Sequence, residues 1–244
     1  MLGTLALTGA ILQPVEDCLG KRVSSAAGEA NIPIARELAG QGVLPALLGG
    51  FRGLAADGFW LRAALAWERN DLPATHLLLR LTVLTDPQPL YFWINGARIM
   101  AYDMPVWRVR QAGGEMPSSI VRRISEEQAQ LALDFLKQAC RYHYNHPALA
   151  VEMANIHLWR RGDMAQAADY YRRAAEMPGA PHYAARIHAE LLRLLGRKRE
   201  ALVWLQALHS RLPVNEKAAE CDIVQARIKE LERELNGTER PDAR

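Results

Sequence analysis

The chain has 244 residues, half of them hydrophobic, and its 30 Lys and Arg residues against 27 Asp and Glu residues give a net charge of +3 at pH 7. This balance excludes an acidic disordered chain, and it gives no reason to expect a nucleic-acid partner. Three scattered cysteines exclude a disulfide scaffold. The length is sufficient for one domain, or two small ones, with a buried core.

The N-terminal segment, residues 1–12, is almost wholly apolar and carries no charge. It is shorter than the ~20 apolar residues that cross a bilayer, and it lacks the Lys or Arg that begins a signal peptide. Three interpretations remain open: a weak secretory or anchoring segment, the surviving part of a longer one, or a short buried helix. Residues 13–48 are punctuated by Gly and Pro, which predicts a linker with short helices.

From Leu54 onward the pattern is helical. Apolar residues recur three and four positions apart, and no stretch alternates with a period of two. This predicts an all-α domain over residues 49–236. Part of it repeats, because Gly162 and Gly196 lie 34 residues apart, each just after the first helix of a predicted pair. A 34-residue helix-turn-helix unit cannot bury its own apolar face, so such units must stack.

The repeat follows the pattern W-x2-L-G-x2-Y, then A-x3-F, then P. Four segments approximate it, beginning at Phe59, Trp93, Val151 and Ala185, and the last two are the clearest. On these residues the chain resembles the tetratricopeptide-repeat (TPR) superfamily over about residues 56–210. The resemblance implies a right-handed solenoid of about four helix-turn-helix units.

Two further segments lie outside the period. The distance from Trp93 to Val151 exceeds one repeat by about 24 residues. This predicts an insertion at about residues 103–126, either a long loop that acts as a lid or a passive surface loop. The amphipathic pattern of residues 214–235 predicts a C-terminal capping helix. Residues 237–244 are predicted to form a polar tail.

A narrower resemblance is carried by four segments, which are Gly49–Asp57, Trp60–Ala63, Tyr91–Trp93 and Ala184–Leu192. They resemble a group of bacterial TPR proteins that have an N-terminal membrane anchor and no known chemistry. This resemblance implies a place in the Gram-negative cell envelope, anchored in the inner membrane and facing the periplasm, in preference to the cytoplasm. The N-terminus would then be a membrane tether.

Catalytic motifs are absent: the sequence has no G-x-S-x-G, no phosphate-binding G-x4-G-K-[ST], no H-E-x-x-H and no C-x-x-C. We therefore expect no enzyme activity, no cofactor and no metal site. The best metal candidate, His143 with His146 and Glu152, is interrupted by a helix-breaking proline. His188 lies on an inner helical stripe and is expected to be a packed core histidine. The basic run Arg197–Arg199 opens a helix, where cations are disfavoured, and is expected to be a solvated turn.

The TPR resemblance implies that the first helix of each unit lines a concave groove. The groove residues by this alignment are Trp60, Trp67, Tyr91, Arg98, Ile156, Trp159, Tyr183, Arg186, Glu190 and Arg193. Because Trp, Tyr and Arg are common anchors of binding, we expect a non-enzymatic scaffold that holds a peptide or helix of a protein partner in this groove. The alternative is a structural subunit of an envelope assembly, whose groove is filled by its own insertion or linker.

Overall fold

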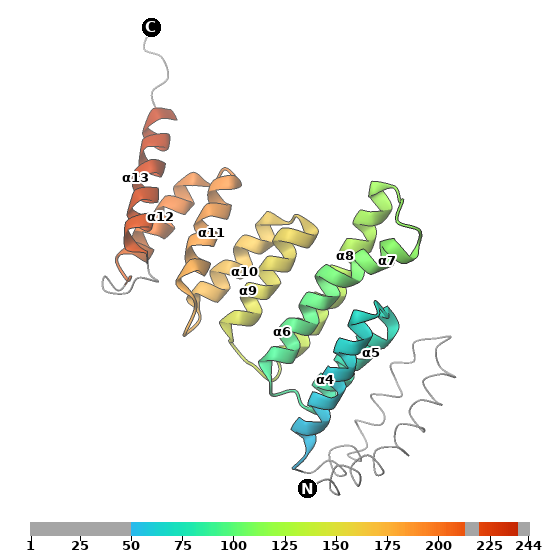
Figure 1. The fold of residues 1–244 in the computed structure, drawn as a ribbon. Helices are drawn as coiled ribbons and strands as arrows, with labels where there is room; N and C mark the ends of the chain where they lie inside the picture. Colours follow the sequence, from blue (N-terminus) through green and yellow to red (C-terminus); the bar gives the residue numbers. More distant parts are fainter. Residues whose placement is uncertain (1–49, 213–219, 239–244) are drawn as a thin grey trace, which may run out of the picture. The chain divides into compact units, whose positions relative to one another are not determined.

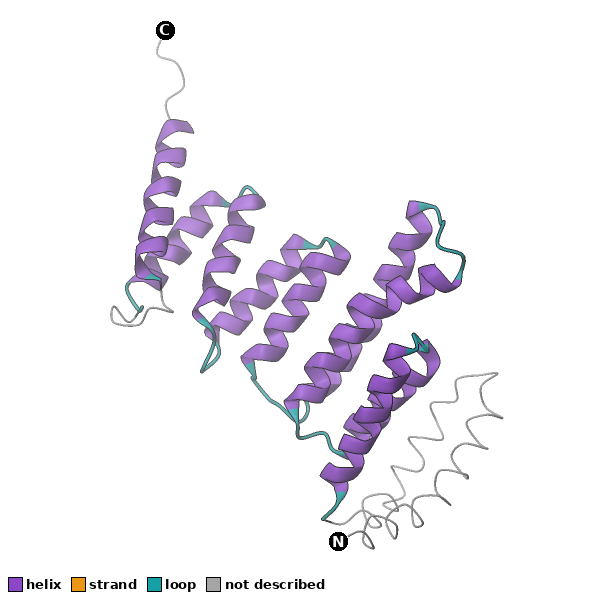
Figure 2. Ribbon diagram, viewed as in Figure 1, coloured by secondary structure: helices purple, strands orange, loops and turns teal. Residues whose placement is uncertain are grey.

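The computed structural model describes residues 50–212 and 220–238, and every regular element in these ranges is helical (Figures 1 and 2). The prediction of an all-α fold is confirmed for this part of the chain. The predicted N-terminal segment 1–12, the linker 13–48 and residues 239–244 of the tail lie outside the described residues.

The chain divides into two compact units, Met1–Gly53 and Leu54–Arg244. The first unit has described residues only at 50–53, and these include the start of the first helix, so the packing below is that of the second unit. Among the described helices, none combines the length and the apolar character needed to cross a membrane.

Helices α4 (Arg52–Glu68) and α5 (Leu72–Thr85) are joined by a tight turn in which Asn70 has a left-handed backbone, with φ of 54°. Asp71 caps α5, because its side chain accepts a hydrogen bond of 3.1 Å from the backbone N–H of Ala74. On α4 the buried residues are small, with Ala56 and Ala63 almost fully enclosed. The predicted first helix-turn-helix segment is therefore present.

The next helix is continuous from residue 90 to residue 111, but it consists of α6 (Leu90–Arg98), the π-helix η1 (Ile99–Asp103) and α7 (Met104–Gln111). Pro105 explains the change of winding, because proline has no N–H to donate to the preceding turn. A turn at Gly113 and Gly114, with φ of 100° and 82°, leads into the long helix α8 (Ser118–Ala139).

This arrangement corrects the prediction of a long loop or lid at residues 103–126. The extra residues lengthen two paired helices, and the stretch between those helices runs only from 112 to 117. Gly113, Gly114 and Pro117 are correct turn signals and lie within those six residues, whereas Pro105 lies within the helix.

The last two helix pairs follow the 34-residue period. They comprise α9 (Pro147–Ile156) with the π-helix η2 (His157–Arg161), then α10 (Met164–Glu176), α11 (His182–Leu194) and α12 (Lys198–His209). Gly162 and Gly196 adopt the left-handed conformation, with φ of 66° and 78°. Both glycines therefore end the first helix of a pair, as the sequence predicted.

The C-terminal helix α13 (Cys221–Thr238) packs against α12. It buries Val224 and Leu231, whereas Ile223 is exposed. Residues 214–219, the first part of the predicted capping helix, lie outside the described part of the chain.

Neighbouring helices contact one another in chain order from α8 to α13, and α6 packs on both α5 and α8 (Figure 1). Close approach requires small residues. A side chain at Gly96 would meet the ring of Phe135 on α8 at 3.0 Å, and the neighbouring Ala97 is fully buried. Apolar side chains form three successive clusters along the chain.

Candidate interaction surface

The N-terminal aromatic residues of the predicted groove have different surroundings. Trp60 is half-buried, and its ring centroid lies 5.3 Å from that of Tyr91 and 5.3 Å from that of Phe92 on α6. Tyr91 is the exposed member of this cluster, with 58% of its surface accessible. Trp60 therefore serves mainly to attach α4 to α6, and Tyr91 is the side chain that a partner can reach.

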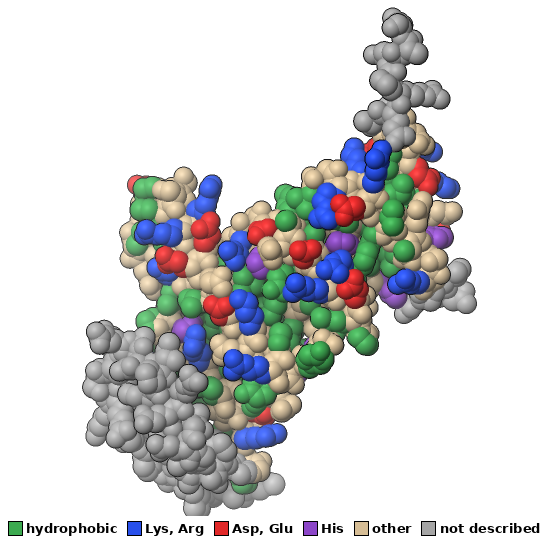
Figure 3. Space-filling view, turned by 180° about the vertical axis from the view of Figure 1, so that it is seen from behind, with side chains coloured by type: hydrophobic (Ala, Val, Ile, Leu, Met, Phe, Trp, Pro, Cys, Tyr) green, Lys and Arg blue, Asp and Glu red, His purple; other side chains and the backbone are tan. Residues whose placement is uncertain are grey.

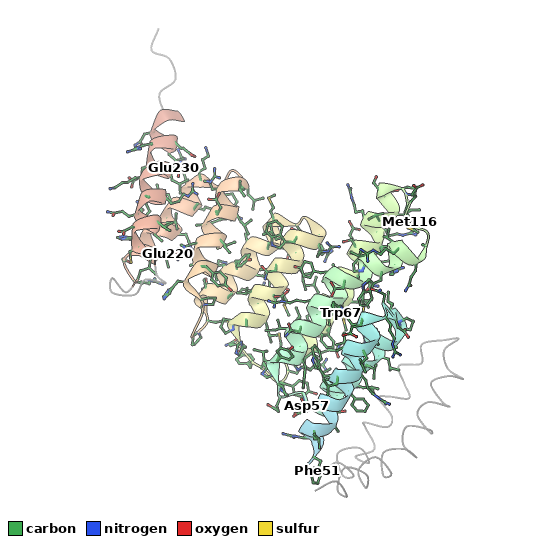
Figure 4. The ribbon with its side chains drawn as sticks, viewed as in Figure 1. Phe51, Asp57, Trp67, Met116, Glu220 and Glu230 are labelled. Carbon is green, nitrogen blue, oxygen red and sulfur yellow. The ribbon has the colours of Figure 1, made fainter. Side chains whose placement is uncertain are left out.

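Trp67, labelled in Figure 4, is held by the chain itself. Its indole N–H donates a hydrogen bond of 2.8 Å to Oδ2 of Asp103, and its ring lies edge-on to Trp107 at a centroid distance of 6.5 Å. Both partners belong to residues 103–111, which we had assigned to the insertion. Although Trp67 is partly exposed, its polar group is already satisfied.

Arg98 and Glu152 form a partly buried ion pair that joins α6 to α9. Nε and Nη2 of Arg98 donate to Oε2 of Glu152 at 3.0 and 2.8 Å, and the Glu152 side chain is only 3% exposed. The hydrogen bonds to Glu152 raise the pKa of Arg98. Glu152 thus has a charged partner where an isolated carboxylate would be very costly.

A second layer of polar groups extends this pair. Asn155 donates to Oε2 of Glu152 at 3.5 Å, and the Tyr171 hydroxyl donates to Oδ1 of Asn155 at 2.6 Å. Burial raises the pKa of Tyr171 to about 12, so the phenol keeps its proton and remains a donor. We call Arg98, Glu152, Asn155 and Tyr171 the Arg98 network.

The two π-helices meet beside this network. The guanidinium of Arg160 in η2 lies over the ring of Tyr102 in η1, 5.5 Å from its centroid. No carboxylate of the described residues pairs with Arg160, and its Nε is buried without a hydrogen-bond partner. The adjacent Trp159 is 69% exposed. A cation and a large aromatic side chain are therefore available together.

Tyr183 and Ile156 are the remaining predicted groove residues near the middle of the described chain. Tyr183 on α11 is 44% exposed, and its hydroxyl lies near enough to Arg98 to act on the pKa of that side chain. Ile156 is fully buried in the core cluster with Met153. Its assignment to the groove is wrong, because this position of α9 faces the helix contacts.

The predicted groove residues on α11 form ion pairs, some of them with residues at or near α13. Arg186 pairs with Glu220 at 2.5 Å, and Glu190 accepts a hydrogen bond from Arg193 at 2.6 Å and forms an ion pair with Arg227 on α13 at 3.4 Å. The sequence predicts Arg186, Glu190 and Arg193 on an open groove. Glu190 instead pairs with the terminal helix and Arg186 with the residue that precedes it, whereas Arg193 pairs with Glu190 within α11. Figure 3 shows charges of both signs interspersed on the face it presents.

The other candidates from the sequence have structural roles. Nε2 of His143 contacts the backbone oxygen of Pro87 at 3.1 Å, and Nδ1 of His146 accepts the N–H of Ala148 at the start of α9. No group of three or more metal-binding side chains occurs in the described ranges. His188 is buried, and its Nδ1 lies 2.8 Å from the Ala168 backbone oxygen, which confirms the packed histidine.

The basic run at residues 197–199 has a structural explanation that the sequence did not reveal. Arg197 donates twice to Glu200, at 2.7 and 2.6 Å. Lys198 pairs with Glu234 of α13 at 2.9 Å. The run therefore helps to hold α12 and α13 together, in place of forming a purely solvated turn.

Two residues of the central surface, Tyr102 and Arg160, were absent from the predicted set. The prediction assumed an uninterrupted α-helical period, whereas a π-helical turn contains more residues and rotates the face that follows. Pro105 was a local signal for η1. We find no comparable signal within residues 157–161 for η2.

No family model matches the sequence, and no curated protein matches it either.

Proposed function

We propose that this protein is a non-enzymatic interaction scaffold, built as a TPR-like solenoid of about four helix pairs with a capping helix. Two features support the repeat: sequential contacts between neighbouring helices and left-handed glycines 34 residues apart. The partner is a segment of another protein, which binds to the face formed by the first helices of the pairs.

The observation that carries this proposal is the contact between η1 and η2. π-helices are rare and occur frequently at functional sites. Here Arg160 of η2, which has no carboxylate partner among the described residues, lies over Tyr102 of η1, and the preceding residue, Trp159, is exposed. Tryptophan and arginine are the side chains most enriched at binding hot spots.

The chemistry of these side chains defines the partner. The indole of Trp159 offers an apolar surface, and the guanidinium of Arg160 offers N–H donors suited to a carboxylate. The preferred ligand is accordingly a peptide segment with an acidic residue beside an apolar or aromatic one. Tyr91 on α6 and Tyr183 on α11 are further exposed aromatic side chains among the predicted groove residues.

The proposal is tested by selecting peptides from a random library on the immobilised full chain. We expect enrichment of Asp or Glu next to an aromatic or aliphatic residue. For a selected peptide, Trp159→Ala should raise Kd by about 30-fold, which corresponds to a hot spot of about 2 kcal/mol, and Arg160→Gln by about tenfold.

The matched control is Arg161→Gln, because Arg161 is the next residue but hydrogen-bonds to Gln130 on α8. Its Kd for the peptide should equal that of the wild type. Peptides without acidic residues, or equal binding by the wild type and Arg160→Gln, would overturn the assignment.

A second candidate is a structural subunit whose surface is covered by its own chain. The hydrogen bond from Trp67 to Asp103 favours it, because residues of the predicted insertion already satisfy one predicted anchor. A selection that yields no specific peptide, together with resistance to proteolysis at Gly113 and Gly114, would support this candidate over the first.

A further inference from the structure

A cavity of about 320 Å³ lies between α8, η2 and α10, and no part of the proposed function uses it. Each of the three elements contributes one helical stripe to its wall. The lining residues are Gln130, Leu133, Lys137, His157, Arg161, Asp163, Gln166 and Tyr170. This volume is at the lower end of the range for small-molecule sites, so a ligand must be small.

The interior side of the cavity contains a histidine with an unmet hydrogen-bonding requirement. His157 is 6% exposed, and its ring stacks on Tyr170 at a centroid distance of 5.2 Å and an interplanar angle of 18°. Its Nδ1 is buried and has no hydrogen-bond partner. Buried polar atoms are nearly always paired, so such an exception requires an explanation.

The rim of the cavity is predominantly cationic. Nη1 of Arg161 donates to Oε1 of Gln130 at 3.2 Å, and no carboxylate within the described residues pairs with this arginine. Lys137 has one such partner, Asp134, at 3.0 Å. The Asp163 carboxylate is engaged as the cap of α10, where Oδ1 accepts the N–H of Gln166 at 3.0 Å.

The charges on all three elements act on His157. Burial lowers the pKa of His157, Arg161 and Lys137 lower it further, and Asp163 opposes them. The guanidinium of Arg173 also lies over the Tyr170 ring, 5.2 Å from its centroid. The imidazole is therefore neutral at pH 7 in an environment with more cations than anions.

We propose that this cavity binds a small oxyanion, either a phosphate group or a carboxylate. Arg161 has guanidinium N–H groups beyond the one used on Gln130, and these match the geometry of oxyanion oxygens. Lys137 and the side-chain amide of Gln166 provide further donors at the rim, whereas Nε2 of Gln130 already donates to Oδ1 of Asp134 at 2.9 Å. His157 and Tyr170 close the cavity on the protein side. The site involves Arg161, whereas the proposed peptide surface involves Arg160, so the two inferences are independent.

The full chain is titrated with inorganic phosphate and, separately, with succinate, while the imidazole resonances of His157 are followed by NMR. We expect saturable shifts and a rise in the pKa of His157 on binding, because an anion favours the protonated ring. Binding of phosphate alone identifies a phosphoryl ligand, and binding of succinate alone identifies a carboxylate. No saturable binding of either anion at millimolar concentrations overturns the proposal.

Two variants locate the site. Arg161→Gln should raise Kd for the anion by about tenfold, the size of one charge-assisted interaction. The matched control Arg160→Gln should leave the Kd for the anion unchanged. The two variants should act the other way round on peptide binding, where Arg160→Gln raises Kd and Arg161→Gln does not. If Arg161→Gln does not fold, Lys137→Gln serves in its place, because Lys137 is exposed. Equal anion affinity in the wild type and these rim variants would show that the anion binds elsewhere.

Discussion

Arginine and glutamate side chains meet in two regions of this molecule, and their surroundings differ. Between α6 and α9, the Glu152 side chain is 3% exposed beneath Arg98. Near the C-terminus, the side chains of Arg193 and Glu190 are 26% and 34% exposed, and those of Arg197 and Glu200 are 48% and 58% exposed. Exposed pairs contribute little because water and salt compete, whereas a buried charge that loses its partner is costly. The same pair of residue types can therefore be essential in one region and dispensable in the other.

The largest difference should come from removing one cation in each region. Arg98→Ala leaves the Glu152 carboxylate buried and uncompensated, and should lower the free energy of unfolding by about 3 kcal/mol, the low end expected for such a loss because Arg98 itself is half exposed. Arg193→Ala should cost about 0.5 kcal/mol or less. Urea unfolding of both variants at pH 7 measures the difference.

Glu152→Gln is the complementary control for this pair. The neutral side chain keeps its shape, and the exposed Arg98 can turn to water, so the cost should be about 1 kcal/mol. Equal losses for Arg98→Ala and Arg193→Ala would contradict the contrast between the two regions.

A smaller effect is expected from His76 on α5. Burial, together with the charge of Arg80, lowers the pKa of His76 to about 4, against 6.5 for a free histidine. Between these values the unfolded chain binds a proton that the folded chain does not, so the free energy of unfolding should fall as pH decreases from about 6.5 toward 4.

The contribution of His76 can be isolated by comparing unfolding at pH 7 and pH 5. We expect the wild type to lose about 2 kcal/mol more than His76→Gln over this interval. If both proteins lose the same amount, other groups determine the acid sensitivity.

The smallest effect concerns the attachment of α13. Its contacts include the exposed pair between Lys198 and Glu234 and the pair between Arg227 and Glu190. Sodium chloride at about 1 M should weaken both pairs by screening, and should increase amide hydrogen exchange in α13. Exchange in α6 and α9 should change less, because the Glu152 carboxylate is shielded from salt. A uniform change along the chain would contradict this expectation.

The sequence was sufficient to predict most of the secondary structure after residue 53. Apolar spacing identified the helices, and the positions of Gly162 and Gly196 identified two helix ends. Prediction was poorest for residues 103–126, where Gly and Pro were interpreted as signs of a long loop. Gly113, Gly114 and Pro117 occupy a short turn, whereas Pro105 lies within the continuous helix of residues 90–111, where the winding changes at η1 because proline has no N–H to donate.

The candidate surface was predicted less well than the fold. Tyr91, Trp159 and Tyr183 are exposed as expected, whereas Ile156 is buried and Trp67 is bonded to Asp103. The residues that were missed depend on the two π-helices, whose effect on helix register is not visible in an α-helical pattern.

The sequence by itself determined the all-α class, the 34-residue spacing and the glycine helix ends, since these depend on local periodicity and on backbone conformations that glycine readily adopts. Only the tertiary structure decided that Arg98 meets Glu152, that Arg160 covers Tyr102, and that Arg161 faces the cavity beside His157. These contacts join residues on different helices, so their formation depends on how the helices pack. Adjacent arginines consequently lie in two different environments, and the sequence provides no local rule that distinguishes them.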